Sequence, residues 1–203
     1  MITEHLFPIP VAVDTIDPST IDHSLKLVNE FVHSTNFGRG AKNQLLTTFD
    51  QDKNFLGLVN DQALITAISE RAQEFMGRLG FRQRRCSIEI WSWLQYNQPG
   101  SHFARHEHYG ALVSGVIYLQ AQPNSGNLVF HSPLDARGVT NRVYEKVLDK
   151  KTGYVDQWVS YQPKPGRIIM FESWLPHSVE TNLSSENRIS VSFNIYAGPA
   201  GEN

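Results

Sequence analysis

The segment 188–196 alternates polar and apolar side chains without a break. Positions 189, 191, 193 and 195 carry Ile, Val, Phe and Ile, whereas the even-numbered positions carry Arg, Ser, Ser, Asn and Tyr. Since successive side chains of a strand point to opposite faces of a sheet, this pattern predicts a strand with one apolar and one polar face. The chain must therefore build at least one sheet whose two faces differ in chemistry.

Downstream of Gly80, the apolar residues follow the short periods and turn signals of further strands. The predicted strands are 87–96, 112–119, 127–131, 154–161 and 167–172. Upstream, apolar residues recur at helical spacing after Pro18-Ser19 and after Asn60-Asp61, and Gly80 stands where a helix C-cap belongs. The predicted fold class is α+β and mainly β: a sandwich or jelly roll backed by N-terminal helices.

Length and charge limit the class of protein. The 203 residues fit a single domain, 1–203, with 1–80 as a helical support and 86–196 as the barrel core. Eighteen basic against twenty acidic side chains leave no basic surface, so nucleic acid is not an expected partner. No stretch approaches the roughly 18 apolar residues of a membrane helix, and no membrane association is expected. The single cysteine, Cys86, suits a reducing compartment, so we expect a cytoplasmic protein, with a homodimer as the default oligomer.

Three histidines have the spacing of metal ligands. In His106-Glu107-His108, positions i and i+2 of a strand face the same side, so the two imidazoles can chelate one ion. His177 lies between two predicted strands, where a third ligand can join them. The alternative is structural, because an isolated His-x-His also occurs without metal.

The polar face of the last strand offers a candidate anchor for an anion. It begins with Arg188 and continues with Ser190, while Tyr118 ends an apolar strand. A buried Arg needs an anionic partner, because an unpaired internal guanidinium is costly, and a guanidinium fork with two hydroxyls can hold a carboxylate. A metal centre and a carboxylate anchor together are what a short keto diacid requires. The alternative places Arg188 at the surface, at the start of its strand.

Taken together, these motifs resemble iron(II)- and 2-oxoglutarate-dependent dioxygenases of the prolyl-hydroxylase type. The resemblance extends from about Phe7 to Tyr196 and is carried by the segments 96–108, 114–119, 125–128 and 165–171, and by His177 followed by Arg188-x-Ser190. It is closest to a small bacterial and phage group whose motif reads His-x-His before a Ser-Gly-Val-x-Tyr strand.

The resemblance implies a double-stranded β-helix, or jelly roll, that binds Fe(II), 2-oxoglutarate and O2. It also implies that Arg188, Ser190 and Tyr118 hold the distal carboxylate of 2-oxoglutarate. The implied reaction hydroxylates an unreactive C–H bond and releases succinate and CO2. The partner would be a small-molecule or peptidyl substrate.

One position departs from the superfamily pattern, which usually has Asp or Glu two residues after the first His. Here that residue is His108. Three interpretations follow: His108 is a third imidazole ligand, Glu107 rotates in, or only two protein ligands bind. Strand alternation disfavours Glu107, so the predicted ligands are His106, His108 and His177.

Two other functions compete with an oxygenase. A cupin is the first, since Gly100, five residues and His106-x-His108 fit the first half of the cupin signature, although positions 112 and 113 are Leu and Val where its Glu would follow. The second is a non-enzymatic ligand-binding jelly roll with structural zinc. The segments Ser34–Asp52 and Asp135–Gly153 are candidate substrate lids. The candidate substrate contacts are Trp93, Trp174 and Arg137.

Overall fold

The computed structural model describes residues 2, 7–35, 37, 45–49, 53–81, 86–134 and 157–199. Its helices are α1 (Pro18–Thr35), α2 (Phe55–Leu58) and α3 (Gln62–Arg78). Its strands are β1 (Val11–Thr15), β2 (Leu45–Thr47), β3 (Cys86–Asn97), β4 (Phe103–His106), β5 (Val113–Gln120), β6 (Leu128–His131), β7 (Trp158–Tyr161), β8 (Arg167–Glu172), β9 (His177–Val179) and β10 (Arg188–Pro199).

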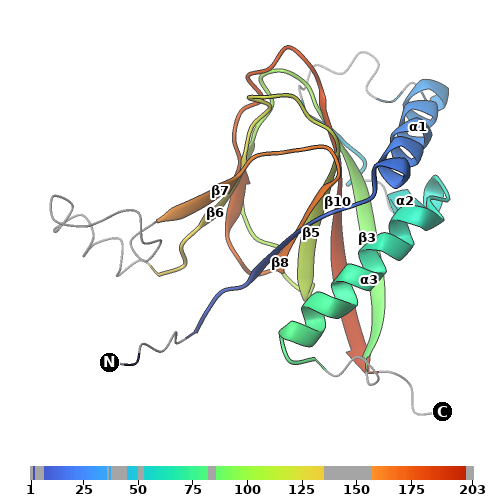
Figure 1. Ribbon diagram of the computed structural model, residues 1–203. Helices are drawn as coiled ribbons and strands as arrows, with labels where there is room; N and C mark the ends of the chain where they lie inside the picture. Colours follow the sequence, from blue (N-terminus) through green and yellow to red (C-terminus); the bar gives the residue numbers. More distant parts are fainter. Residues whose placement is uncertain are drawn as a thin grey trace, which may run out of the picture.

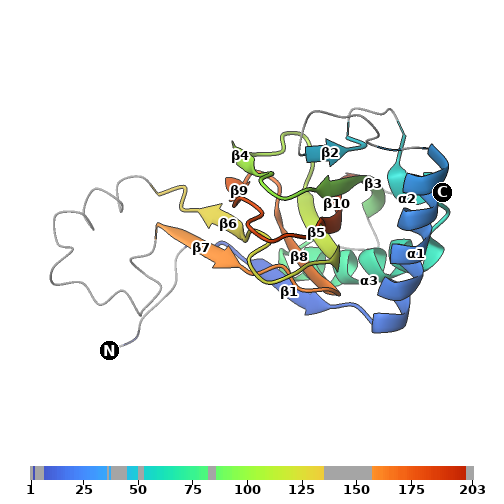
Figure 2. The ribbon, with the colours of Figure 1, turned by 90° about the horizontal axis from the view of Figure 1, so that it is seen from above.

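The strands form two antiparallel sheets that face each other. The larger sheet has the order β1-β8-β5-β10-β3-β2, and the smaller has the order β4-β9-β6-β7. Viewed from above, the smaller sheet lies opposite β8, β5, β10 and β3, and the helices cover the other face of the larger sheet (Figure 2). This arrangement confirms the predicted mainly β jelly roll backed by N-terminal helices (Figure 1).

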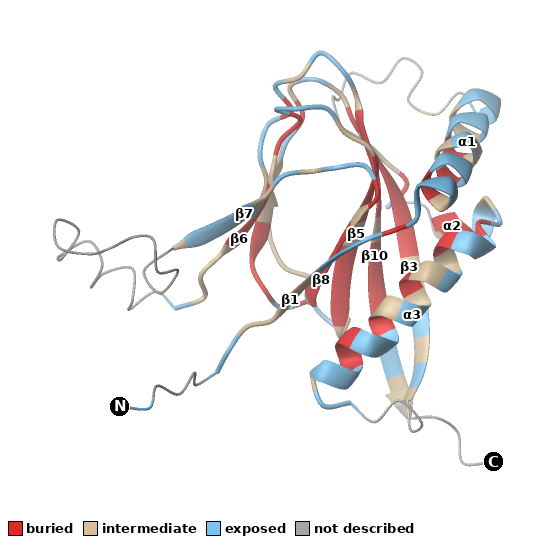
Figure 3. Ribbon diagram, viewed as in Figure 1, coloured by how far each residue is buried: buried red, intermediate tan, exposed pale blue. Residues whose placement is uncertain are grey.

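The helical support follows from local signals and from apolar burial. The Asp61 carboxylate caps α3 by accepting a hydrogen bond from the Leu64 N–H at 3.0 Å, and Gly80 beyond its end adopts a φ of +93°. The apolar faces of α1 and α3 pack with the larger sheet in one core that includes Val28, Ile68 and Leu94. Figure 3 shows buried residues along the larger sheet and on the helix faces turned toward it.

Strand β10 is at the centre of the larger sheet, between β3 and β5. Its odd-numbered residues 189–195 are buried in the helix-covered core, as the alternation predicted. The Phe193 ring lies over Gly115 of β5, where a Cβ atom would overlap the ring. The even-numbered residues 188–192 line the space between the sheets instead. The alternation thus separates a structural core from a polar interior.

Several elements differ from the expectations. Strands β1, β2, β4 and β9 and helix α2, each of five residues or fewer, were not predicted. The strand predicted at 154–161 begins at Trp158 within the described residues. None of the described helices has the length and apolarity needed to cross a membrane.

Candidate metal centre

The three predicted histidines come from two neighbouring strands and one loop. His106 ends β4 and is the antiparallel partner of His177, which begins β9. His108 lies beyond the end of β4, so strand alternation is not what brings it to His106. Instead, its backbone N–H donates to the Ser173 carbonyl oxygen at 2.9 Å, which ties the loop to the turn after β8.

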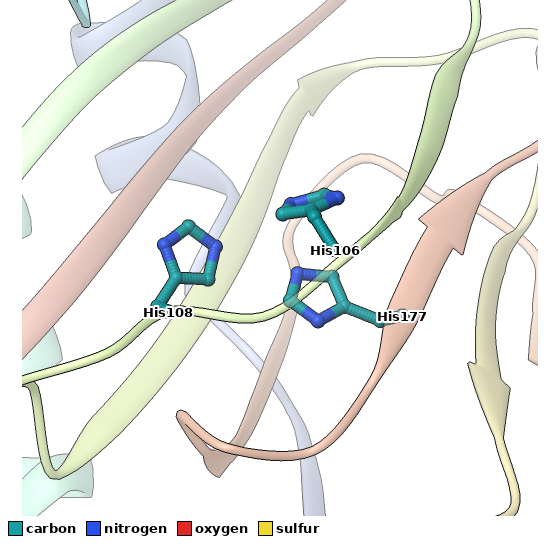
Figure 4. A group of neighbouring side chains, drawn as sticks. All are labelled: His106, His108 and His177. Carbon is teal, nitrogen blue, oxygen red and sulfur yellow. The ribbon is translucent and has the colours of Figure 1, made fainter.

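The three imidazoles form a compact group (Figure 4). The ring centroids are 4.3 Å apart for His106–His177, 5.2 Å for His106–His108 and 5.3 Å for His108–His177. One nitrogen of each ring lies within 4.8 Å of the others. Ligands about 2.1 Å from one ion are at most about 4.2 Å apart, so small side-chain rotations suffice to bring all three onto a metal.

Backbone carbonyls set the tautomers of two of these rings. Nδ1 of His106 lies 2.8 Å from the Ala104 carbonyl oxygen, and Nδ1 of His177 lies 2.9 Å from that of Leu175. Since a carbonyl oxygen only accepts hydrogen bonds, each Nδ1 carries the proton and each neutral ring has an unprotonated Nε2. This is the arrangement in which metal-binding histidines are usually oriented.

Burial keeps two of the three imidazoles, His108 and His177, uncharged in the absence of metal. Burial, with a smaller contribution from the neighbouring His106, lowers the pKa of His177 to about 3 and that of His108 to about 4. Both imidazoles are therefore neutral at pH 7, as metal ligation requires.

Glu107 lies outside this group. Its carboxylate accepts a hydrogen bond at 2.6 Å from the hydroxyl of Tyr109, which is an exposed residue. Within the described residues, the group of potential ligands consists of the three histidines and has no carboxylate. The geometry therefore favours His108 over Glu107 as the third donor.

The histidines open into a pocket that continues between the sheets to the predicted anion anchor. The empty space in and at the mouth of this pocket is about 550 Å³, a volume that includes open solvent. Its lining includes the three histidines together with Arg188, Ser190 and Tyr118. Ser190 is the cross-strand partner of Tyr118, so register alone brings these two hydroxyl-bearing residues together.

Arg188 is inside the barrel and not at its surface. Its side chain is 2% exposed, which contradicts the surface alternative. Nη1 donates to the carbonyl oxygens of Ser125 at 2.7 Å and Gly126 at 2.8 Å, whereas Nε has no partner among the described residues. No carboxylate of the described residues forms an ion pair with it. Within the described part of the chain, the guanidinium is thus held from one side and has no anionic partner.

At neutral pH Arg188 is charged and Tyr118 is protonated, although burial acts on both groups. Burial lowers the pKa of Arg188, and burial raises the pKa of Tyr118 to about 12. An arginine remains a cation even after such a shift. At neutral pH the site therefore presents a cation and a neutral hydroxyl, both suited to a carboxylate.

The predicted substrate contacts lie in different surroundings in the structure. Trp93 is buried and lines the pocket, with its ring centroid 5.7 Å from that of His108 and 5.0 Å from that of Phe49. Trp174 is 44% exposed and is not part of the pocket lining. Arg137 and the excursion Asp135–Gly153 lie outside the described residues, as does most of Ser34–Asp52.

Sequence reasoning missed the two carboxamides of the pocket, Gln95 and Asn97 of β3. They continue at two-residue spacing from Trp93, so all three share one face of the strand. That spacing was visible in the sequence. What it could not show was that this face points into the pocket.

Comparison with known proteins decides the family. A family model described as "Putative 2OG-Fe(II) oxygenase" matches residues 91–194, which include every predicted metal and anchor residue. The chain belongs to this 2OG-Fe(II) oxygenase family. It is therefore a 2-oxoglutarate-dependent oxygenase, whose cofactor is Fe(II) and whose co-substrates are 2-oxoglutarate and O2. Membership decides against the cupin and the non-enzymatic alternatives.

Solved structures share the fold of this oxygenase. A prolyl-4-hydroxylase from Pseudomonas putida has a TM-score of 0.59 at 15% identity, covering 93% of this chain and 92% of that one. EvdO2 from Micromonospora carbonacea var. aurantiaca, complexed with 2-oxoglutarate, has a TM-score of 0.60 at 15% identity, covering 95% and 88%. A Trichoplax adhaerens prolyl hydroxylase in complex with a peptide fragment has a TM-score of 0.58 at 15% identity, covering 92% and 83%. No curated protein gave a significant sequence match.

Proposed function

We propose that His106, His108 and His177 hold Fe(II), and that this oxygenase hydroxylates a C–H bond of a small-molecule or peptidyl substrate. The overall reaction converts R–H, O2 and 2-oxoglutarate to R–OH, succinate and CO2. The observation that carries the proposal is the shared pocket, with three imidazoles in its lining and a buried guanidinium that has no ion-pair partner among the described residues.

The donor set suits the metal. Imidazole nitrogen is a good ligand for ferrous iron, and three protein ligands leave positions of a six-coordinate ion free for other molecules. With a third imidazole in place of the usual carboxylate, the protein ligands carry one negative charge fewer. When bound, Fe(II) supplies the coordination site and the redox chemistry for 2-oxoglutarate and O2.

The side chains of the pocket bind and orient the co-substrate. Because Nη1 of Arg188 is taken by two carbonyl oxygens, its free Nε–H edge is the one that would donate to the distal carboxylate. The hydroxyls of Ser190 and Tyr118 would donate to the same group. Trp93 and Phe171 contact two of the imidazoles and limit access of water to them.

The substrate is expected to be a small molecule or a peptide. A peptide is supported by the Trichoplax adhaerens prolyl hydroxylase of the same fold, which was solved with a peptide fragment. Trp93, next to His108, is the proposed substrate contact within the described pocket. A reducing, cytoplasmic location agrees with the single cysteine.

The test is conversion of 2-oxoglutarate to succinate by protein reconstituted anaerobically with Fe(II) and then exposed to O2. We expect slow succinate formation without added substrate, and none with metal-free protein or with the His177→Ala variant. Succinate formation that is equal in His177→Ala and wild type would refute the proposed metal site.

A further inference from the structure

The inner face of β3 turns two carboxamides into the pocket. Asn97 is 1% exposed and Gln95 is 8% exposed. Neither Nδ2 nor Oδ1 of Asn97 has a hydrogen-bond partner among the described residues, and the same is true of Oε1 of Gln95. Buried amides are nearly always paired, because an unpaired amide loses its hydrogen bonds to water without replacement. Of these three atoms only Nδ2 of Asn97 is a donor, so it is the one that an anionic ligand could pair.

The register of β3 and β10 places the carboxamides beside the anchor. Asn97 is the cross-strand partner of Arg188, and Gln95 is the partner of Ser190. The next pair toward the metal is Trp93 with Ser192, and the Trp93 ring lies against His108. Directly opposed residues have Cβ atoms about 5 Å apart. Asn97 therefore lies at the Arg188 end of this row, and Gln95 lies between that end and the metal end.

We propose that Asn97 is a recognition residue for the co-substrate and limits the chain length of the co-substrate. This inference rests on the proposed function. Nδ2–H of Asn97 donates to the distal carboxylate beside Arg188. A carboxylate has about four lone-pair positions and binds several donors at once, so Asn97 can share it with Arg188, Ser190 and Tyr118.

The position of Asn97 also lets it limit the length of the diacid that fits the pocket. A 2-oxo diacid must reach the metal with its keto end and Arg188 with its distal carboxylate. A four-carbon diacid falls short of Arg188, whereas a six-carbon diacid has to enter the space that the Asn97 carboxamide fills. We therefore expect wild type to prefer 2-oxoglutarate over both oxaloacetate and 2-oxoadipate.

The first test is calorimetric titration of these three diacids into the Fe(II)-loaded protein without O2. Asn97→Ala should weaken 2-oxoglutarate binding about tenfold, which corresponds to about 1.4 kcal/mol, because one donor is lost. It should also reduce the ratio of the affinity for 2-oxoglutarate to that for 2-oxoadipate, because space opens at the end of the pocket. Asn187→Ala is the matched control, since that carboxamide donates to the Tyr96 hydroxyl and does not line the pocket. It should leave all three affinities unchanged.

The second test separates recognition from a structural role. Asn97→Asp places a carboxylate opposite the buried Arg188 cation. This carboxylate would be an ion-pair partner, which the described residues do not give Arg188. The metal-free variant should therefore melt at a higher temperature than wild type, while 2-oxoglutarate binding falls by roughly a hundredfold or more. Gln95→Ala should weaken 2-oxoglutarate less than Asn97→Ala does, because Gln95 lies away from the distal carboxylate.

The outcomes distinguish this inference from the proposed function. If 2-oxoglutarate binds wild type and Asn97→Ala equally, with the same order of the three diacids, the role of Asn97 is refuted and the proposed function stands. An Asn97→Asp protein that binds 2-oxoglutarate like wild type refutes it as well. If wild type itself binds no 2-oxoglutarate, the proposed function fails first.

Discussion

The Arg188→Ala substitution tests the anion anchor most directly. The guanidinium is buried, its Nη1 is held by two carbonyl oxygens, and its Nε–H is free for a ligand. Hydrogen bonds to charged groups contribute about 1.5–3 kcal/mol each. A carboxylate on this edge accepts from Nε–H and from the neighbouring Nη2–H. Losing these two hydrogen bonds corresponds to about 3–6 kcal/mol, and even the lower figure weakens binding more than a hundredfold. We therefore expect at least a hundredfold loss of 2-oxoglutarate affinity.

Calorimetric titration of 2-oxoglutarate into the metal-loaded variant measures this loss. Metal affinity should not change, because Arg188 is not a proposed ligand. Lysine at position 188 should restore binding only in part, since a point charge cannot bind two carbonyl oxygens and also present a free N–H edge. Thermal unfolding provides the folding control, because the substitution leaves the carbonyl oxygens of Ser125 and Gly126 without their donor.

Equal affinities of wild type and Arg188→Ala for 2-oxoglutarate would refute the anchor. An Arg188→Ala protein that loses metal and 2-oxoglutarate together would show that Arg188 supports the whole barrel interior and does not recognise the carboxylate. A selective loss of 2-oxoglutarate, in a protein that still folds and binds metal, is the result that the structure predicts.

Three further predictions concern the metal centre and the support of Arg188. His108→Asp should keep or strengthen Fe(II) binding in anaerobic titrations, because it adds a negative charge beside a dication; sharply weaker binding would show that the neutral ligand is required. Metal-free protein should lose stability as the pH falls below about 6.5, because unfolded His108 and His177 take up protons that their folded forms, with pKa values of about 4 and 3, do not. The loss of stability at pH 5 is at most about 2 kcal/mol per histidine, since one pKa unit is about 1.4 kcal/mol and His108 is only partly buried. Denaturation of His177→Gln should show a shallower dependence of stability on pH. An unchanged pH dependence would show that these histidines are not its cause. Gly126→Ala should lower the free energy of unfolding by about 1–3 kcal/mol, because Gly126 has a φ of +88° and a Cβ there would overlap the Glu180 carbonyl oxygen. It should also weaken 2-oxoglutarate binding, because that Cβ would lie 3.1 Å from Nη1 of Arg188, which donates to the Gly126 carbonyl oxygen. Wild-type values in urea denaturation and in calorimetry would contradict this prediction.

The elements that the sequence revealed are those with a repeating local pattern. Helices α1 and α3 show apolar residues at helical spacing, and β10 shows an unbroken two-residue alternation. These patterns are readable because side-chain direction within one element depends only on local backbone geometry. The His-x-His motif and the Arg188-x-Ser190 pair were visible for a related reason, since their residue types and spacing already limit the chemistry.

Other features needed residues that are distant in the sequence. Strands β4 and β9 have only a few residues each, and they exist because they pair with one another and bring His106 opposite His177. The position of His108 depends on a hydrogen bond to the Ser173 carbonyl oxygen, and the outward position of Glu107 was only disfavoured, not excluded, by the sequence.

The clearest division concerns Arg188 and Asn97. The alternation of β10 showed that Arg188 lies on a polar face, but a polar face can point either to solvent or into a barrel. The packing of the smaller sheet over the larger one made it an interior face, and the register of β3 with β10 placed the Asn97 carboxamide opposite the guanidinium. Local geometry determines which side chains share a face of a strand, whereas burial depends on what packs against that face, and only long-range pairing decides it.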